Sequence, residues 1–385
     1  MSDYCAKKKY PWFRENIHDS ICYGPKFAMF KQNVSLDIDT KRAVLKAASS
    51  VVALLSYTGD QELTECSGVI IENDATNAHI VLTSAKLIRR PTKQNVLEDH
   101  LANNLKVVIY MYHGGSYEGL VCAYDFHYNI AWIRFESDSS IPTARLRLVD
   151  DFINVNRAEE KSVYLRPHST HFKLVPGGAI VGVGRYFSKP FDLMAAPGEF
   201  IVDRCFDEFD CNELLLGTHL ITRCGEGGPL INLSGEVIGI SFYETGLFTP
   251  FLPINIAQKS WEHYKVCGEV RRPFLGIVAT NLWVVDISHV ERVLRMVPSI
   301  GNGVHVEKVI EGSSFDSAGL LEDDAIVQCG GSTVHSFMEF FEMLWDKKVG
   351  DVLQLGIVRA CENELIHVNL VFDEVVQKCH RWPRT

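Results

Sequence analysis

The stretch Cys224–Asn232 decides the fold, and it reads Cys-Gly-Glu-Gly-Gly-Pro-Leu-Ile-Asn. Its three glycines indicate a tight turn, because glycine adopts backbone angles that other residues avoid. The apolar residues that end the stretch have the length of a short strand, and a second apolar run, Val237–Phe242, follows after Ser234 and Gly235. The segment therefore predicts a tight loop that leads into two strands joined by a turn.

Short apolar runs of this kind recur through the preceding 180 residues, with turn residues between them. Many short strands with few helices favour an all-β sandwich or barrel. A helix is expected at Asp37–Ser50, and Trp261–Val270 has the composition of a linker. The expected strands are 51–57, 68–72, 79–83, 105–112, 131–135, 179–182, 200–202, 229–232, 237–242 and 251–254.

Residues 273–372 have a mixed pattern, which is typical of a separate α+β domain of about 100 residues. Strands are expected at Gly303–Ile310 and at three later runs, and a short helix at Ser313–Ala318. A longer helix is expected at Ser336–Trp345, where helical spacing favours a core role for its apolar residues. These core candidates are Phe337, Phe340, Phe341 and Leu344.

Cys224–Asn232 resembles the nucleophile loop of trypsin-like serine proteases of the HtrA/Deg group, whose pattern is Gly-Asn-Ser-Gly-Gly-Pro-Leu. Val81–Lys86 is similar to the family's Val-Leu-Thr-Asn-Ala-His, and Tyr128–Ile133 to its Asp-Leu-Ala-Val-Leu segment. Phe274–Ile277 resembles the carboxylate-binding loop of an HtrA-type PDZ domain. The resemblance implies a mainly β chain, with a trypsin-like double β-barrel followed by a PDZ-like α+β domain. Its expected parts are an N-terminal arm and helix at 1–45, a protease-fold domain at 46–264, a PDZ domain at 273–372 and a tail at 373–385.

All three positions of the family's catalytic triad are substituted. The resemblance places Lys86 at the histidine, Asn129 at the aspartate and Glu226 at the serine. The mechanism needs a nucleophile whose proton passes to a neutral imidazole, itself oriented by a carboxylate. Glu226 has no hydroxyl, and a lysine is protonated near neutral pH. We therefore expect no intact catalytic residue, and only a relic oxyanion loop at Cys224 and Gly225, because Cys224 replaces the usual glycine.

Other chemistries at these positions were weighed against this interpretation. Cys224 could be a displaced nucleophile, although a buried structural thiol is favoured. Ser84 with Lys86 could form a Ser–Lys dyad, and Glu226 with Lys86 an acid–base pair, but nothing else in the segment suits either. Our own hypothesis is that Lys86 and Glu226 form an ion pair that plugs the former active site.

The PDZ-like segment departs less from its family. PDZ domains add a peptide strand to a sheet edge and hold the C-terminal carboxylate on backbone amides. Here the peptide-binding residues would be Phe274, Leu275, Gly276 and Ile277. The partners implied are protein C-termini or extended peptides, active HtrA/Deg-like relatives, and a homotrimer built through the N-terminal arm.

Composition limits the other partners and the compartment. The 385 residues carry a net charge of −10, and phosphate neutralisation requires a surplus of lysine and arginine, so no nucleic-acid partner is expected. No run of about 18 apolar residues occurs, so no membrane span is expected. The eleven cysteines show no C-x-x-C spacing and no signal or transit peptide is evident, which favours reduced thiols in the cytoplasm or nucleus.

No cofactor and no metal site is expected from the sequence. His168 and His171 have metal-like spacing, but a histidine pair in a loop is usually solvated. The sequence thus favours a catalytically inactive homologue that binds peptides or proteins through its PDZ domain and vestigial cleft. The alternatives are a serine-type endopeptidase with an unorthodox site and a chaperone-like holdase.

Overall fold

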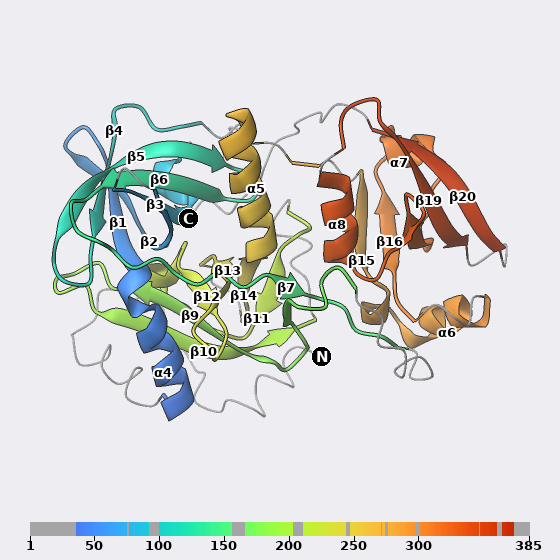
Figure 1. Cartoon of the computed structure of the whole chain (residues 1–385), viewed down its shortest axis with the longest axis horizontal. Coiled ribbons are helices and arrows are strands. Elements are labelled where there is room, and N and C mark those ends of the chain that lie inside the picture. The colour runs from blue at the N-terminus through green and yellow to red at the C-terminus, as the bar shows by residue number, and fades with distance from the viewer. Residues whose placement is uncertain are drawn as a thin grey trace.

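The computed structural model describes residues 36–74, 77–91, 100–155, 166–202, 211–243, 247–270, 272–273, 276–296, 301–345, 347–359 and 364–372. These residues form two closed six-stranded barrels followed by an open sheet (Figure 1). The mainly β architecture expected from the sequence is confirmed. Among the described helices, none has the length and apolar character needed to cross a membrane.

The first barrel closes in the order β1-β2-β3-β6-β5-β4, and all of its neighbouring strands are antiparallel. Inward side chains such as Leu54, Val81 and Ile133 are fully buried and fill it. Strand β5 was not predicted, because Gly119 interrupts its apolar pattern; a Cβ there would lie 2.5 Å from Ile133 Cγ2. The strands are β1 Val51–Thr58, β2 Gln61–Asn73, β3 Ala78–Ser84, β4 Leu105–Tyr110, β5 Ser116–Asp125 and β6 Ile130–Glu136.

The second barrel closes in the order β10-β11-β14-β13-β12-β9. Its interior is packed by Ile180, Leu230, Ile238 and Phe251. A separate parallel pair, β7 with β8, lies between the two barrels in the sequence. The strands are β7 Val149–Asp150, β8 Phe172–Lys173, β9 Ala179–Arg185, β10 Leu193–Ile201, β11 Leu215–Gly217, β12 Pro229–Ile231, β13 Val237–Ser241 and β14 Thr249–Pro253.

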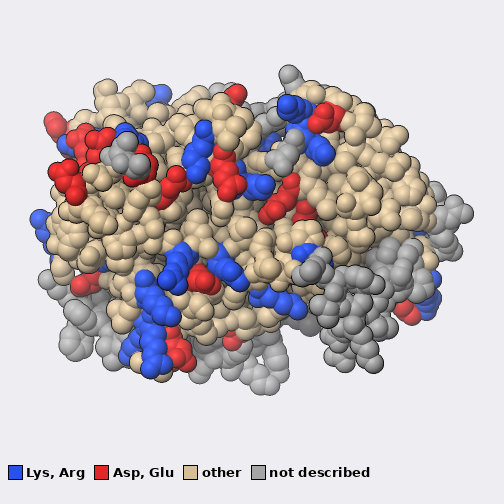
Figure 2. Space-filling model, in the orientation of Figure 1, with Lys and Arg blue, Asp and Glu red and all other residues tan. Residues whose placement is uncertain are grey.

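The predicted helix before the barrels is α4, Ile38–Ala47, followed by a 3-10 turn, η1, at Ala48–Ser50. Asp37 caps it, since its carboxylate accepts the amides of Asp39 and Thr40 at 2.9 Å. Ala43, Val44 and Ala47 bury one face, while lysine and arginine side chains gather on the surface along α4 (Figure 2).

The predicted linker is wrong, because helix α5 runs through it from Ile254 to Cys267. Its polar residues concealed one apolar face. On that face Trp261 stacks on Trp132 of β6 with ring centroids 5.7 Å apart, and its indole donates to Glu72 at 2.8 Å. The helix ends at Gly268, which has the left-handed conformation (φ 77°) that favours glycine at this position.

The third sheet has the order β15-β16-β17-β19-β20, with β18 paired to β17. The four core candidates of the long helix are buried, as predicted. Helix α6 was not predicted. The elements are β15 Ile277–Asn281, η5 Leu282–Val284, α6 Ile287–Met296, β16 Val304–Val309, α7 Ser314–Ser317, β17 Ala325–Cys329, β18 Ser332–Thr333, α8 Phe337–Trp345, β19 Val352–Arg359 and β20 Glu364–Val371.

Helix α8 is buried on nearly every side, with seven of its nine residues inaccessible. A helix of this kind lies between two packed bodies. In Figure 1 it stands between its own sheet and the side of the barrels that carries α5. The open sheet is therefore docked against the barrels through α8.

Candidate functional site

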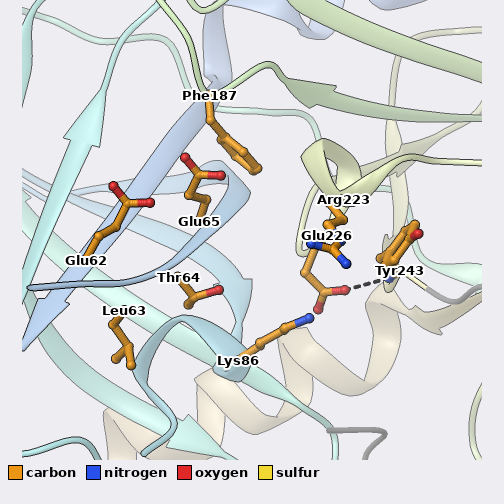
Figure 3. Close-up of a pocket in the computed structure, with 9 residues that line it drawn as sticks. All are labelled: Glu62, Leu63, Thr64, Glu65, Lys86, Phe187, Arg223, Glu226 and Tyr243. Atoms are coloured by element: carbon orange, nitrogen blue, oxygen red, sulfur yellow. Dashed lines mark hydrogen bonds between the residues drawn. The ribbon is translucent and has the colours of Figure 1, made fainter. Parts of the chain in front are cut away.

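The former active-site region lies where the two barrels meet. Lys86 belongs to a 3-10 turn, η2 (Ala85–Ile88), that follows β3, and Glu226 ends another, η4 (Arg223–Gly225), before β12. Both side chains line one pocket of about 220 Å³ (Figure 3). Glu62 and Glu65 of β2 and Arg223 supply further charge around it. The structure thus brings together Lys86 and Glu226, two of the three positions at which the sequence predicts a substituted triad.

The loop that carries Glu226 is held by Ser67 of β2. The Ser67 hydroxyl donates to the carbonyl of Cys224 at 2.6 Å, and the Ser67 amide donates to the carbonyl of Glu226 at 2.7 Å. The amide of Arg185 in the second barrel donates to the same hydroxyl at 2.8 Å. The loop is therefore pinned to both barrels at once.

Two glycines of the loop are required by this close packing. Gly227 has a φ of 72°, and a Cβ there would lie 2.4 Å from the amide nitrogen of Ser84. A Cβ at Gly228 would lie 2.1 Å from the carbonyl oxygen of Val183. The glycine pattern therefore serves the packing at the junction of the barrels.

The Glu226 carboxylate is buried, with 4% of the residue exposed. Its Oε2 accepts the amide of Tyr243 at 2.6 Å (Figure 3). Among the described residues, no group donates a hydrogen bond to its other oxygen, Oε1. Lys86 points toward this carboxylate in Figure 3, but it does not donate to Oε1. The two charges therefore face one another in the pocket, and the ion pair itself stays a prediction.

The relic oxyanion loop is folded into the 3-10 turn η4. The Cys224 amide donates to the Thr222 hydroxyl at 3.3 Å and the Gly225 amide to the Thr222 carbonyl at 2.8 Å. The Glu226 amide donates to the carbonyl of Arg223 at 3.2 Å. An oxyanion hole needs preorganised donors directed at the reacting oxygen. In this structure all three amides are used within the loop.

Asn129 lies apart from the pocket lining. It has a φ of 52°, a left-handed conformation that asparagine tolerates. Its side-chain oxygen accepts from Arg89 at 3.2 Å, and its carbonyl accepts the Ala85 amide at 2.9 Å. Asn129 therefore shapes the turn beside η2 and orients no base.

The alternative nucleophiles are engaged elsewhere. Cys224 is 1% exposed and packs among Met194, Ala196 and Ile221, as expected of a structural thiol. The Ser84 hydroxyl is buried and accepts the main-chain amide of Lys86 at 3.2 Å, which makes it the cap of η2.

Two buried titratable groups of the barrels, Cys66 and His219, carry no signal in the sequence. Burial, followed by the charge of Glu226, raises the pKa of the Cys66 thiol well above its ordinary value. Burial lowers the pKa of His219 to about 3, and its Nε2 lies 3.1 Å from the Ser241 hydroxyl. Cys66 therefore stays a thiol and His219 a neutral ring, and both act as core residues. Only tertiary burial distinguishes them from reactive groups.

Comparison with known proteins agrees with this geometry. Residues 66–240 match a family model described as a trypsin-like peptidase domain, and residues 273–370 match one described as a PDZ domain. The chain belongs to the HtrA/Deg-like family.

Relatives of this HtrA/Deg-like chain include a putative protease Do-like 14 of Arabidopsis thaliana, which is 29% identical and covers 76% of this chain and 61% of its own length. The serine protease HTRA4 of Mus musculus is 26% identical over 84% of this chain and 62% of its own length. The chain thus spans about three fifths of these relatives. The solved HtrA-type protease AlgW with tripeptide is similar in fold, with a TM-score of 0.53, 15% identity and coverage of 87% of this chain and 96% of its own.

Part of the expected peptide site lies in the described PDZ domain. Phe274 and Leu275 fall outside the described residues. Gly276 has a φ of 59°, and its carbonyl accepts the Ile310 amide at 2.9 Å and the Ser313 hydroxyl at 3.1 Å. Ile277 is buried and begins β15, which among the described strands pairs with β16 alone and so lies at the edge of the sheet.

The expectation that His168 is solvated is wrong. His168 is buried, and its Nε2 lies 3.0 Å from Glu342 of α8. Nearby, Arg166 bridges Asp150 at 2.6 Å and Glu339 of α8 at 3.1 Å. We call these five residues the interdomain cluster. Its charges come from segments about 170 residues apart, which is why sequence spacing could not reveal it.

Asp151 extends the same contact toward the PDZ sheet edge. Its Oδ2 accepts from the Asn281 side chain at 2.7 Å, and its carbonyl accepts the Trp283 indole at 3.1 Å. Asn281 ends β15 and also accepts the Phe337 amide of α8 at 2.7 Å. The end of the edge strand and the start of α8 are therefore both bonded to the protease-fold domain.

Proposed function

We propose that this HtrA/Deg-like chain does not cleave peptides and acts as a binding or regulatory module through its PDZ domain and its vestigial cleft. The position and bonding of the Glu226 side chain carry the proposal. A buried carboxylate stands at the nucleophile position and accepts the Tyr243 amide at 2.6 Å. Such a group has no hydroxyl with which to form an acyl intermediate.

The surroundings of Glu226 support the same conclusion. A lysine ammonium such as that of Lys86 has three donors and no acceptor, so it cannot take a proton from a nucleophile. The amides of Cys224 and Glu226 are bonded inside η4. Loss of a whole triad reduces turnover by about 10⁶-fold, and the residual rate depends on an oxyanion hole.

Activity is tested on the full chain with casein and with a fluorophosphonate probe for nucleophilic serines. We expect no labelling and no digestion above that of a Glu226→Ala variant. Digestion by the wild type that disappears in Glu226→Ala would overturn the proposal. Equal traces of digestion in both proteins would point to a contaminating protease and leave the expected result standing.

The binding activity in this proposal is the capture of peptides by the PDZ domain. The edge position of β15 supports it, since an edge strand presents unpaired backbone groups to an added strand. A positive φ and close packing against Ser313 give the Gly276 backbone a defined conformation. The partners proposed are free protein C-termini or extended peptides.

A peptide array of free and amidated C-termini tests this capture. We expect hits that require the free carboxylate and disappear in Gly276→Arg. Gly331→Arg is the matched control, because Gly331 also has a positive φ but no atom within 4 Å of its would-be Cβ. If Gly276→Arg still binds the same peptides, or if amidated and free C-termini bind equally well, capture of the carboxylate in this loop would be refuted.

Association with active relatives, a homotrimer and a nucleo-cytoplasmic location complete the proposal. All six cysteines among the described residues are free thiols, which supports a reducing compartment. The arm that would support a trimer lies outside the described residues. Light scattering of the full chain, and microscopy of a tagged copy, test the two points directly.

A further inference from the structure

Two buried histidines of the PDZ domain converge on one carboxylate. His289 comes from α6, His305 from β16, and Asp323 from the turn before β17. His289 Nδ1 and His305 Nε2 each lie 3.8 Å from Asp323 Oδ1, and the two rings have centroids 4.5 Å apart. All three donor atoms lie within 4.8 Å of one another.

The distances leave this arrangement without a direct hydrogen bond to the carboxylate. At 3.8 Å, neither ring nitrogen is close enough to donate to Asp323. The opposite nitrogen of His289, Nε2, is buried and has no hydrogen-bond partner among the described residues. Buried polar atoms normally have partners. The polar surroundings of the His289 ring are therefore concentrated on the Asp323 side.

The carboxylate is held in place and is open to solvent. Asp323 has a φ of 69°, its amide donates to the Val306 carbonyl at 2.9 Å, and the Val306 amide donates to the Asp324 carbonyl at 2.8 Å. The turn is thus pinned to the strand that carries His305. The Asp323 side chain is 67% exposed, so an ion has a path to the site.

We propose that His289, His305 and Asp323 bind a divalent transition-metal ion of the zinc class. Two imidazole nitrogens and one carboxylate oxygen are a common ligand set for such ions, with water in the remaining positions. Donors around a tetrahedral zinc ion lie about 3.4 Å apart. The two spacings of 3.8 Å from a ring nitrogen to the carboxylate oxygen exceed this value by a few tenths of an ångström, and the spacing between the two ring nitrogens is within 4.8 Å and would shorten with them.

A neighbouring arginine side chain reaches the same nitrogen of His289 that faces the carboxylate. Arg292 Nη2 lies 3.4 Å from Nδ1, the nitrogen that faces Asp323. The exposed guanidinium of Arg292 therefore occupies part of the position that a metal cation would take.

A second group of possible ligands, His127, Cys211 and Glu213, has a different character. The Cys211 thiol donates to Glu213 Oε2 at 3.4 Å, and His127 Nε2 lies 3.5 Å from the same oxygen. These residues satisfy one another directly. The proposal is therefore confined to the site in the PDZ domain, which would tie α6 to the sheet.

The test uses the full chain, stripped with EDTA, and zinc alone as the probe. We expect one zinc per chain by calorimetry and a zinc-dependent rise in melting temperature. Asp323→Asn should reduce the affinity for zinc by at least about tenfold, since even changes to residues that only contact a metal ligand reduce metal affinity by about 10–100-fold. Asparagine tolerates the left-handed backbone, so the metal-free melting temperature should be kept. Glu322→Gln, an exposed neighbour, is the matched control and should bind as the wild type does.

Two further measurements locate the ion. Arg292→Ala should bind zinc more tightly, and cobalt should give visible bands without the intense sulfur charge-transfer band of a cysteine site. Absence of any zinc-dependent shift in the wild type would overturn the proposal. So would unchanged affinity in Asp323→Asn, or loss of binding in Cys211→Ser, which would assign the ion to the other group.

Discussion

At the scale of single residues, the pocket between the barrels is defined by how Glu226 is bonded. Its carboxylate accepts the Tyr243 amide. The loop amides are bonded inside η4. Glu226 is therefore held in place both by its side chain and by its loop.

The glycines of this loop give a prediction on stability. Gly227→Ala should lower the free energy of unfolding by clearly more than the backbone strain alone, because the new Cβ would lie 2.4 Å from the Ser84 nitrogen. Gly177→Ala is the control, with a φ of 78° but no atom within 4 Å. By urea denaturation we expect the free energy of unfolding to fall by about 1–2 kcal/mol in the control and by more in Gly227→Ala. Equal losses would show that loop packing is not the reason for this glycine.

At the scale of elements, Arg185 joins the start of the first barrel to the second. Its guanidinium donates to the carbonyls of Val51, Ala48 and Phe191. Burial lowers the pKa of Arg185 to about 10, so it is charged at neutral pH. The element boundary between η1 and β1 is thus fixed by a side chain from β9.

Arg185→Met should therefore be strongly destabilising. It leaves three carbonyls without this donor, two of them in buried bonds and one in a partly buried bond, and we expect a loss of roughly 3 kcal/mol or more in the free energy of unfolding. Arg134→Met is the matched control, because Arg134 pairs with Glu136 on the surface and should change stability by less than about 1 kcal/mol. A small effect at Arg185 in chemical denaturation would show that the carbonyls find water instead.

Most elements followed from local pattern, and the exceptions have physical reasons. The strand runs and the core face of α8 were predicted because burial on one face leaves a period in the sequence. The sequence of Trp261–Val270 predicts a linker instead of the end of α5, because the apolar face of this helix is narrow and the residue it packs on, Trp132, is distant in the chain. β5 is not predicted because Gly119, which packs closely against Ile133, has no side chain and so interrupts the apolar pattern of the strand.

At the scale of the whole molecule, the PDZ domain is docked through the interdomain cluster. Burial alone lowers the pKa of His168, but the hydrogen bond and charge of Glu342, with the charges of Glu339 and Asp151, raise it above its ordinary value. The pKa values of Glu339 and Glu342 are lowered, although burial opposes this, chiefly by His335 and His168 respectively. Burial raises the pKa of Asp151, which opposes docking once that group is ionised.

These directions predict how docking depends on pH. Because the pKa of His168 is raised in the docked state, its protonation stabilises docking fully below about pH 6.5. This stabilisation is lost as the pH rises through the raised pKa. Because the pKa values of the two glutamates are lowered, their ionisation stabilises docking above about pH 4.3. This stabilisation is lost as the pH falls through the lowered pKa values. Docking should therefore be strongest between about pH 4.3 and 6.5, and small-angle scattering should show a larger radius of gyration at pH 8 than at pH 6.

His168→Gln should remove most of this difference between pH 6 and pH 8. His113→Gln changes an exposed histidine outside the contact and should preserve it. A pH response that is identical in the two variants would mean that another group controls the docking.

The sequence by itself determined the family and the two kinds of domain, while the assignment of triad positions stays a prediction. It could do so because the glycine-rich loop and the strand periods are local constraints on the backbone. Only the tertiary structure decided that Glu226 is seated on Tyr243, that the loop amides are bonded inside η4, and that His168 is buried against Glu342. These contacts join residues that are distant in the chain or depend on burial, and neither leaves a pattern in one sequence.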